Sequence, residues 1–365
     1  MSAQRAALAL LALLASSCGG GGGGGAVGAL GVSGSATYED KAYDRKGFTG
    51  ERPRRPVRGA VVQLVADDDH SVLAASSTDA NGAYALSASV AGGRSVHVAL
   101  VASSQPPCNV DVLNSLSEVY ALAGPSFSGG GVSSQDLFAA EAQLGGVFNI
   151  LDAASRGCGL VLALRPGASF PKLRIFWQAG SNGTFYDGSG IRLLGTTADP
   201  DQYDDDIILH EFGHYVEDRF TFSTSPGGDH NPYDNRPEPP ALAWSEGFAH
   251  WWSAETRGNA GQVDTTATGR SFFELEGPTP GGVTRGAGNE IAVGAILWDV
   301  SDPANEGHDR INRKRSKLWE VASVYFRQER PDTTIDTFCD GWIALGLGET
   351  SALGAIFRNR DVSCP

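Results

Sequence analysis

Three residues with metal-site chemistry, His210, Glu211 and His214, form a His-Glu-x-x-His pattern within the segment 207–216. Side chains four residues apart lie on one face of a helix, so both imidazoles can reach a single ion, as zinc sites require. Glu211 follows the first histidine and is placed to take a proton from a water molecule whose pKa the metal has lowered. The pattern therefore predicts a zinc site that activates water, with Glu211 as general base.

The sequence around this motif predicts a buried helix. Pro200 precedes acidic residues that favour a helix start, because carboxylates stabilise the positive end of the helix dipole: Asp201, Asp204, Asp205 and Asp206. Apolar residues then occupy nearly every face of the segment 207–216. An ordinary amphipathic helix with two surface histidines is the alternative. A buried helix, however, rarely keeps two histidines and a glutamate without a partner.

A hydrolytic zinc site needs a third protein ligand and one open position. Glu246 is the best candidate, because its segment predicts a helix whose tryptophans lie on a different face. His250 shares the face of Glu246 and is the competing choice, either as the ligand itself or as a partner that orients one. A glutamate that only stabilises a helix start is a further alternative. Gly247 and Ala249 favour Glu246, because small residues let its helix approach the motif helix closely.

The His-Glu-Phe-Gly-His segment at 210–214 and Glu246-Gly247-Phe248-Ala249 resemble the gluzincin metallopeptidases, the thermolysin, fungalysin and M1 aminopeptidase-like group. Segments 185–188 and 289–292 look like fungalysin surroundings. The resemblance covers residues 170–300. It implies zinc bound by His210, His214 and Glu246, with Glu211 as general base and then proton donor to the leaving amine. It also implies that an edge strand at 191–196 pairs with an extended peptide substrate.

The sequence departs from the gluzincin pattern in its spacing. The gap between His214 and Glu246 is longer than in most gluzincins, so the segment 223–240 is expected to be an inserted loop over the cleft. His250 stands where thermolysin-like enzymes place an aspartate one turn after the ligand glutamate. The residue that helps stabilise the oxyanion stays open among four candidates: His230, Tyr233, His308 and Tyr325.

The segment 32–105 predicts an all-β unit. Short strands are expected at 57–65, 72–78, 83–86 and 95–101, and this spacing is typical of a small antiparallel sandwich. Val57-Arg58-Gly59-Ala60 and the segment 78–84 look like the carboxypeptidase regulatory-like (transthyretin-like) β-sandwich, which implies a fold and no catalytic residue. An acidic loop at Asp67, Asp68 and Asp69 is a possible calcium (Ca2+) site, although a solvated turn is the preferred interpretation.

The N-terminus predicts export. Arg5 precedes a short apolar run at 6–15, which is too short to span a membrane. The segment 14–18 resembles a bacterial lipoprotein signal, which implies that Cys18 becomes lipidated and anchors the protein to the cell-envelope membrane. Ala15 departs from this pattern, because such signals usually carry an aliphatic residue there. Secretion with cleavage nearby is the alternative. The glycine-rich residues 19–31 then form a flexible tether.

Export makes the remaining four cysteines informative. In an oxidising compartment an even number of cysteines without CxxC spacing favours disulfides over buried thiols. Pairing of nearest neighbours predicts the bonds Cys108–Cys158 and Cys339–Cys364. The formal charge of −14 makes nucleic acid an unsuitable partner.

The chain of 365 residues is long enough for two domains. The expected division is a signal peptide at 1–18, a tether at 19–31, the sandwich at 32–105 and a zincin-like domain at 106–365. The expected fold class is multidomain α+β, with a mostly helical C-terminal half. One helix is expected to begin at 134–136, and another begins after its cap Asn289. Helices are also expected over 244–254 and 317–328, and strands over 172–177 and 191–196.

The leading functional hypothesis is an exported zinc endopeptidase that acts on peptide or protein substrates. A surface binding or adhesion lipoprotein with a non-catalytic zincin-like domain is the alternative. The intact Glu211 argues against it, since a degenerate site usually loses its base first. A zinc hydrolase with another substrate is a third hypothesis, and the expected edge strand weighs against it.

Overall fold

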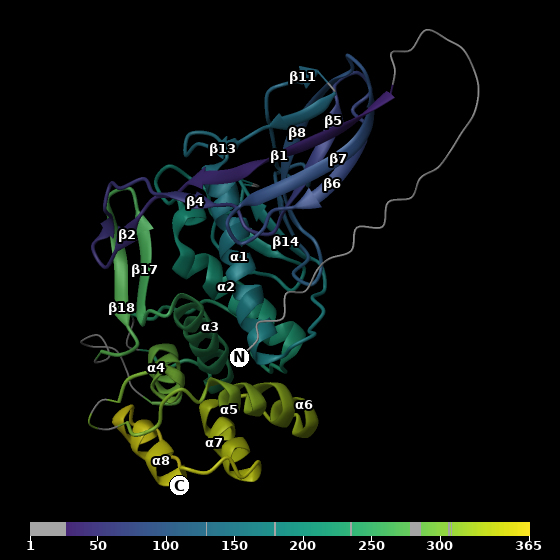
Figure 1. The fold of residues 1–365 in the computed structure, drawn as a ribbon. Coiled ribbons are helices and arrows are strands. Elements are labelled where there is room, and N and C mark those ends of the chain that lie inside the picture. The colour runs from purple at the N-terminus through teal and green to yellow at the C-terminus, as the bar shows by residue number, and fades with distance from the viewer. Residues whose placement is uncertain are drawn as a thin grey trace.

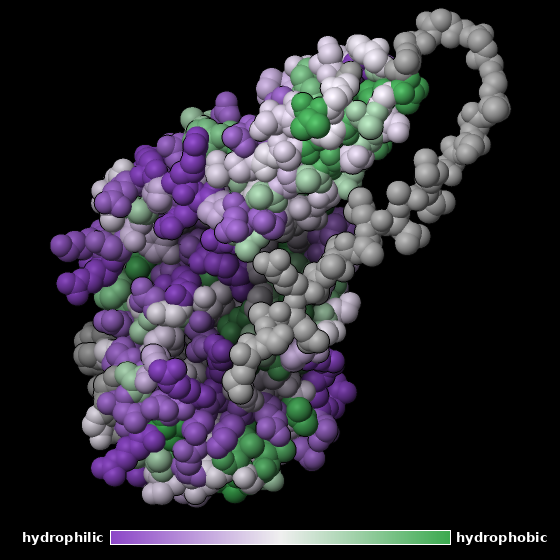
Figure 2. Space-filling view, viewed as in Figure 1, coloured by the Kyte–Doolittle hydropathy of each residue, from purple (hydrophilic) through white to green (hydrophobic). Residues whose placement is uncertain are grey.

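The computed structural model describes residues 27–365 apart from 129, 179, 234–235, 278–285, 306 and 308. The expected export signal, Cys18 and most of the tether therefore lie outside the described residues. Strands gather at one end of the molecule and helices at the other, with α1 to α4 between them (Figure 1). Hydrophilic side chains cover much of the helical end, whereas apolar side chains are more frequent at the strand-rich end (Figure 2).

Two sheets build the strand-rich end. In the first, β1 (Val27–Glu39) pairs antiparallel with β7 (Ala83–Ala91) along its outer part. The second contains β5 (Ala60–Ala66), which lies between β6 (Val72–Ser77) and β8 (Ser95–Ser104). Inward-facing residues of both sheets belong to one buried core. All four predicted strands are present, although several of their ends differ from the prediction, and the mixed α+β class is confirmed.

The second sheet continues into the C-terminal part of the chain. Its order is β15-β16-β14-β9-β8-β5-β6, and the joining strand β9 (Val110–Leu113) contacts both β8 and β14 (Leu173–Trp177). Strand β16 (Ile191–Leu193) lies between β14 and β15 (Phe185–Tyr186). The prediction of an edge strand at 191–196 was therefore wrong, because the short strand β15 covers its outer side.

The helix expected to open at 134–136 begins later. Residues Gly131–Ser134 and Leu137–Ala139 form β12 and β13, which pair parallel with β1, and α1 starts only at Gly145. Leu137 and Ala139 are buried while Phe138 between them is exposed, which is the alternation of a strand. In the sequence, the apolar residues of β13 and of α1 follow one another with the spacing of a single helical face. Only the pairing of β13 with β1 shows that β13 is a strand and that the helix begins after it.

Helix α1 (Gly145–Leu164) packs against β8 and β9 of the second sheet. Of the most apolar stretch of this helix, 67% is buried inside the protein, as is usual for a core helix. Helices α2 (Asp205–Phe220), α3 (Pro240–Arg257) and α4 (Glu290–Ser301) follow as neighbours in space. The cap predicted at Asn289 is confirmed, since its side chain accepts a hydrogen bond from the Ala292 amide.

The remaining elements are shorter. The C-terminal helices are α5 (Arg315–Glu320), a π turn (Val321–Tyr325), α6 (Phe326–Glu329), α7 (Ile335–Ala344) and α8 (Thr350–Asn359). A hairpin of β17 (Gly261–Thr266) and β18 (Gly269–Glu274) lies beside α2. The other elements are β2 (Tyr43–Asp44), β3 (Gly47–Phe48), β4 (Arg54–Pro56), β10 (Ala121–Ala123), β11 (Phe127–Ser128) and a 3-10 turn (Asp201–Tyr203).

Both predicted disulfides are present. Cys108–Cys158 joins the loop after β8 to α1, and Cys339–Cys364 ties the C-terminal segment to α7. Each bond closes its loop and so reduces the conformational freedom of the unfolded chain.

Candidate metal centre

Helices α2 and α3 lie close enough for their side chains to meet at one point. A Cβ atom at Gly213 would lie 2.9 Å from the Cα atom of Ala249, so only glycine fits at this crossing. The expectation that Ala249 faces the motif helix is confirmed. The same expectation for Gly247 was wrong, because a Cβ atom there would lie 2.5 Å from Val293 on α4. Gly247 instead allows α4 to approach α3.

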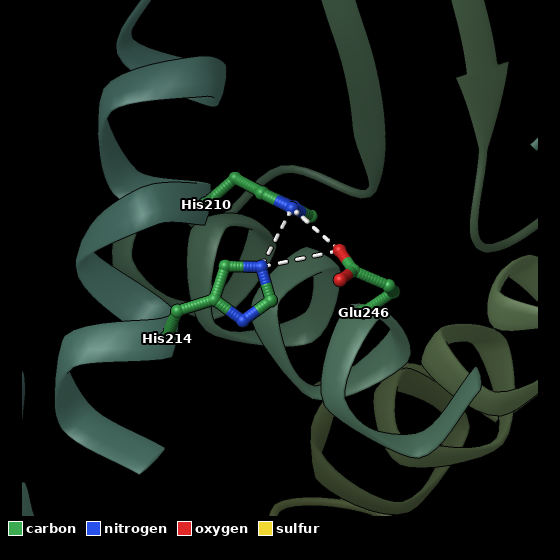
Figure 3. Close-up of side chains that lie close together, drawn as sticks. All are labelled: His210, His214 and Glu246. Carbon is green, nitrogen blue, oxygen red and sulfur yellow. Dashed lines mark hydrogen bonds and ion pairs between the residues drawn. The ribbon is translucent and has the colours of Figure 1, made fainter. Parts of the chain in front are cut away.

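Three ligand atoms converge across this crossing (Figure 3). The Nε2 atoms of His210 and His214 lie 3.2 Å apart, and Oε2 of Glu246 lies 3.1 Å from each of them. Ligand atoms that each lie about 2.1 Å from a tetrahedral zinc ion are roughly 3.4 Å apart. Two imidazoles and one carboxylate are also a donor set that zinc accepts. His210, His214 and Glu246, hereafter the ligand group, therefore fit a zinc ion.

Glu211 lies beside this group. Its side chain is buried, yet it lines a cavity of about 850 Å³, hereafter the main cavity, together with His210, His214 and Glu246. Residues of β15 line the same cavity. A substrate in the cavity would therefore reach the ligand group and the glutamate at once.

Two aspartates at the start of α2, the N-cap Asp204 and Asp206 in the first turn, do more than favour a helix start. Asp204 accepts hydrogen bonds from the Thr265 amide and hydroxyl, and Asp206 accepts one from the Val263 amide at 2.6 Å. Asp206 also forms an ion pair with Arg257 at 2.9 Å. These contacts fasten the first turn of α2 to β17 and α3, and thereby fix the direction of the helix that carries His210 and His214.

The second nitrogen of His214 is held by a polar chain that the sequence did not reveal. Its Nδ1 atom lies 3.3 Å from Oγ of Ser245, and this hydroxyl donates a hydrogen bond of 2.5 Å to Glu217. Burial raises the pKa of Glu217 to about 7. In the sequence, only two weak signals pointed to this polar chain: Glu217 lies about one helical turn after His214, and Ser245 directly precedes Glu246.

The second nitrogen of His210 faces His250. The two Nδ1 atoms lie 3.1 Å apart, while Nε2 of His250 lies 3.4 Å from Oε2 of Glu290 on α4. His250 is not part of the group His210, His214 and Glu246. The structure thus places it as a contact of one of these histidines.

Charge is unevenly divided within the group. Burial and the neighbouring His250 lower the pKa of His210 to about 4. Burial alone would lower the pKa of His214 too, but the carboxylate of Glu246 outweighs it and raises the pKa to about 10. The same attraction outweighs the burial of Glu246 and holds its pKa well below the usual value. Without a metal, His214 and Glu246 thus form a buried ion pair.

The four candidates for the oxyanion residue separate in space. Nε2 of His230 lies 3.4 Å from Glu246 and the side chain lines the main cavity. Tyr233 packs on Phe273 beside a neighbouring cavity of about 430 Å³. Tyr325 packs against α7, and His308 lies outside the described residues. His230 is therefore the candidate that the structure brings to the ligand group.

The acidic loop of the strand-rich end is engaged by other side chains. Arg94 forms ion pairs with Asp68 and Asp69 at 2.7 and 2.8 Å. Asp67 contacts His97 at 2.6 Å. These contacts agree with the preferred interpretation of a solvated turn.

Residues 167–341 match the family described as "Mycolysin C-terminal domain". This match supports a zinc-metallopeptidase family context for the part of the chain that carries the motif and Glu246. No curated protein matches the chain. Ten chains of solved structures match, among them two that share little of the fold. One is the major plantain pollen allergen Pla l 1, with 22% identity, coverage of 31% of this chain and 91% of that one, and a TM-score of 0.18.

The second is a 9R-lipoxygenase from Cyanothece PCC8801, with 10% identity, coverage of 38% of this chain and 25% of that one, and a TM-score of 0.18. Likenesses this weak carry no argument about fold or function. The family match and the geometry of the ligand group are therefore the findings that bear on activity.

Proposed function

We propose that this chain is an exported zinc metallopeptidase that hydrolyses peptide bonds, with zinc held by His210, His214 and Glu246. The observation that carries the proposal is the convergence of three ligand atoms at 3.1–3.2 Å beside Glu211 in an open cavity. The match of residues 167–341 to a mycolysin domain supports it.

Each residue has a distinct role in this mechanism. Bound zinc would lower the pKa of the attacking water and polarise the scissile carbonyl. Glu211 accepts the proton of that water and then delivers it to the leaving amine. Ser245 and Glu217 hold the ring of His214, and His250 holds that of His210.

The substrate proposal rests on β15. This two-residue strand is the outermost of its sheet, and its residues Phe185 and Tyr186 line the main cavity. An extended peptide that adds to β15 would pass the ligand group, and the half-exposed ring of Phe185 offers it apolar contact. The substrate strand is thus β15 and not the segment 191–196.

The proposal includes export and attachment. The N-terminal signal directs the protein out of the cell, and a lipid on Cys18 anchors it to the envelope membrane through the tether 19–31. Secretion without a lipid is the alternative. Residues 32–105 form a carboxypeptidase regulatory-like module that positions the peptidase part, residues 106–365.

A chelation assay tests the function. The purified protein is incubated with casein or gelatin, with and without a chelator, and zinc is then added back. We expect cleavage that the chelator stops and zinc restores. A protein that holds zinc but cleaves neither substrate would favour the alternative, a surface binding or adhesion lipoprotein whose zincin-like domain is not catalytic.

A further inference from the structure

A second group of ligand atoms lies next to the first. His230, Glu246 and Glu290 each offer one atom, and these atoms all lie within 4.8 Å of one another. Nε2 of His230 is 3.4 Å from Oε2 of Glu246 and 3.9 Å from Oε2 of Glu290. Glu246 is common to both groups, whereas His230 and Glu290 come from the loop before α3 and from α4. Three separate parts of the chain thus meet at this point.

Glu290 is the unusual member of this second group. Its side chain is 0% exposed, and neither carboxylate oxygen has a hydrogen-bond partner among the residues that the structure describes. A buried carboxylate without donors is strongly unfavourable unless a cation or a proton neutralises it. The glutamate is firmly held in this position, because it lies in the first turn of α4, directly after the cap Asn289. The close approach at Gly247 keeps α4 against α3.

Among the described residues, two histidines face Glu290, but neither forms a hydrogen bond with it. Nε2 of His250 is 3.4 Å from Oε2 of Glu290 and is itself buried, with no hydrogen-bond partner in the described part of the chain. Glu238 adds a further carboxylate, one of whose oxygens is also buried and without a partner. Separations of 3.4–3.9 Å are too long for charge-assisted hydrogen bonds but close to those between two ligands of one metal ion.

We propose that His230, Glu246 and Glu290 bind a second divalent cation of the zinc type, adjacent to the first and bridged to it by Glu246. One imidazole and two carboxylates are a donor set that zinc accepts. The cation neutralises the carboxylates around Glu290. It also ties the loop that carries His230 to α3 and α4, and so fixes one wall of the main cavity. A proton shared between Glu238 and Glu290 is the competing explanation.

Metal stoichiometry separates the two explanations. The full chain is stripped with a chelator, titrated with ZnCl2 in a calorimeter and, after dialysis, analysed for bound zinc. We expect two zinc ions per chain, and one in Glu290→Gln and in His230→Gln. His97→Gln is the matched control, because His97 also faces a carboxylate, Asp67, but in the strand-rich end. Circular dichroism verifies that each variant is folded.

The outcomes also distinguish this proposal from the proposed function. One zinc in the wild type, lost in His214→Gln, would overturn the second site and leave the peptidase proposal intact. Two zinc ions in Glu290→Gln would likewise overturn it. Zinc binding that survives His214→Gln but disappears in Glu290→Gln would contradict the peptidase site and keep the second one.

Substitution with cobalt shows whether the two bound metal ions lie next to each other. Two Co2+ ions bridged by Glu246 couple magnetically, so we expect a much weaker paramagnetic resonance signal per cobalt in the wild type than in Glu290→Gln. Two additive, uncoupled signals would place the second ion elsewhere and overturn the proposal.

Discussion

His250 presents its Nδ1 atom to the Nδ1 atom of His210 at 3.1 Å. One of the two atoms must carry the proton, and a proton on His210 leaves its Nε2 lone pair free toward Glu246 and His214. With the proton on His210, His250 accepts this hydrogen bond and fixes the tautomer of a proposed zinc ligand, although it is not part of the ligand group itself. In the proposed site this contact separates the role of His250 from that of Glu246, which the sequence left as competitors for the third ligand position.

The first prediction follows from that separation. Glu246→Ala removes a ligand and should abolish zinc retention, whereas His250→Ala should weaken zinc affinity about 10- to 100-fold, as loss of a ligand's hydrogen-bond partner does. Competition with a chromogenic chelator measures both affinities. A zinc-soaked crystal with His250 on the metal and Glu246 turned away would contradict the gluzincin arrangement, although a metallopeptidase would remain.

The second prediction concerns Glu211. Glu211→Gln keeps the shape of the side chain and all three ligands but cannot accept a proton, so zinc content should be unchanged. Turnover of a peptide substrate should fall by about 10²–10⁴-fold, the usual contribution of a general base. Zinc analysis and kcat are measured on the same sample. Wild-type turnover in this variant would refute the mechanism.

The third prediction is a proton released when zinc binds. In the metal-free protein the pKa of His214 is raised, so the ring is charged at pH 7, whereas a zinc ligand must be neutral. Zinc affinity should therefore rise about tenfold per pH unit around neutrality, because one proton leaves for each ion bound. Calorimetry in buffers of different ionisation enthalpy reports the proton directly. Heats that do not depend on the buffer would show that His214 is already neutral.

The fourth prediction concerns the crossing of α2 and α3. Gly213→Ala places a Cβ atom against the Ala249 backbone, so unfolding free energy should fall by about 1–3 kcal/mol and zinc affinity should fall with it. Gly159→Ala on α1 is the matched control, since nothing lies within 4 Å of its new Cβ atom. Its helix should be stabilised by up to about 1 kcal/mol. Urea unfolding measures both, and equal effects would show that the crossing tolerates a side chain.

The sequence by itself was sufficient where the signal is local. Two histidines four residues apart share a helix face whatever surrounds them, and Asn289 caps α4 with its own side chain. Short apolar runs between turn signals located β5 to β8, because both signals belong to the segments themselves. The disulfides also followed from a local rule, the pairing of nearest cysteines.

Only the tertiary structure decided the relationships between segments far apart in the chain. The pairing of β13 with β1 joins residues about a hundred positions apart, so the pattern of 134–139 alone could not reveal a strand. Strand β15 lies outside β16, and Gly247 contacts α4. Both arrangements depend on packing partners from other segments, which the periodicity of one segment does not specify. The same holds for Glu290, whose burial beside Glu246 depends on how closely α4 approaches α3, which no local pattern in either helix determines.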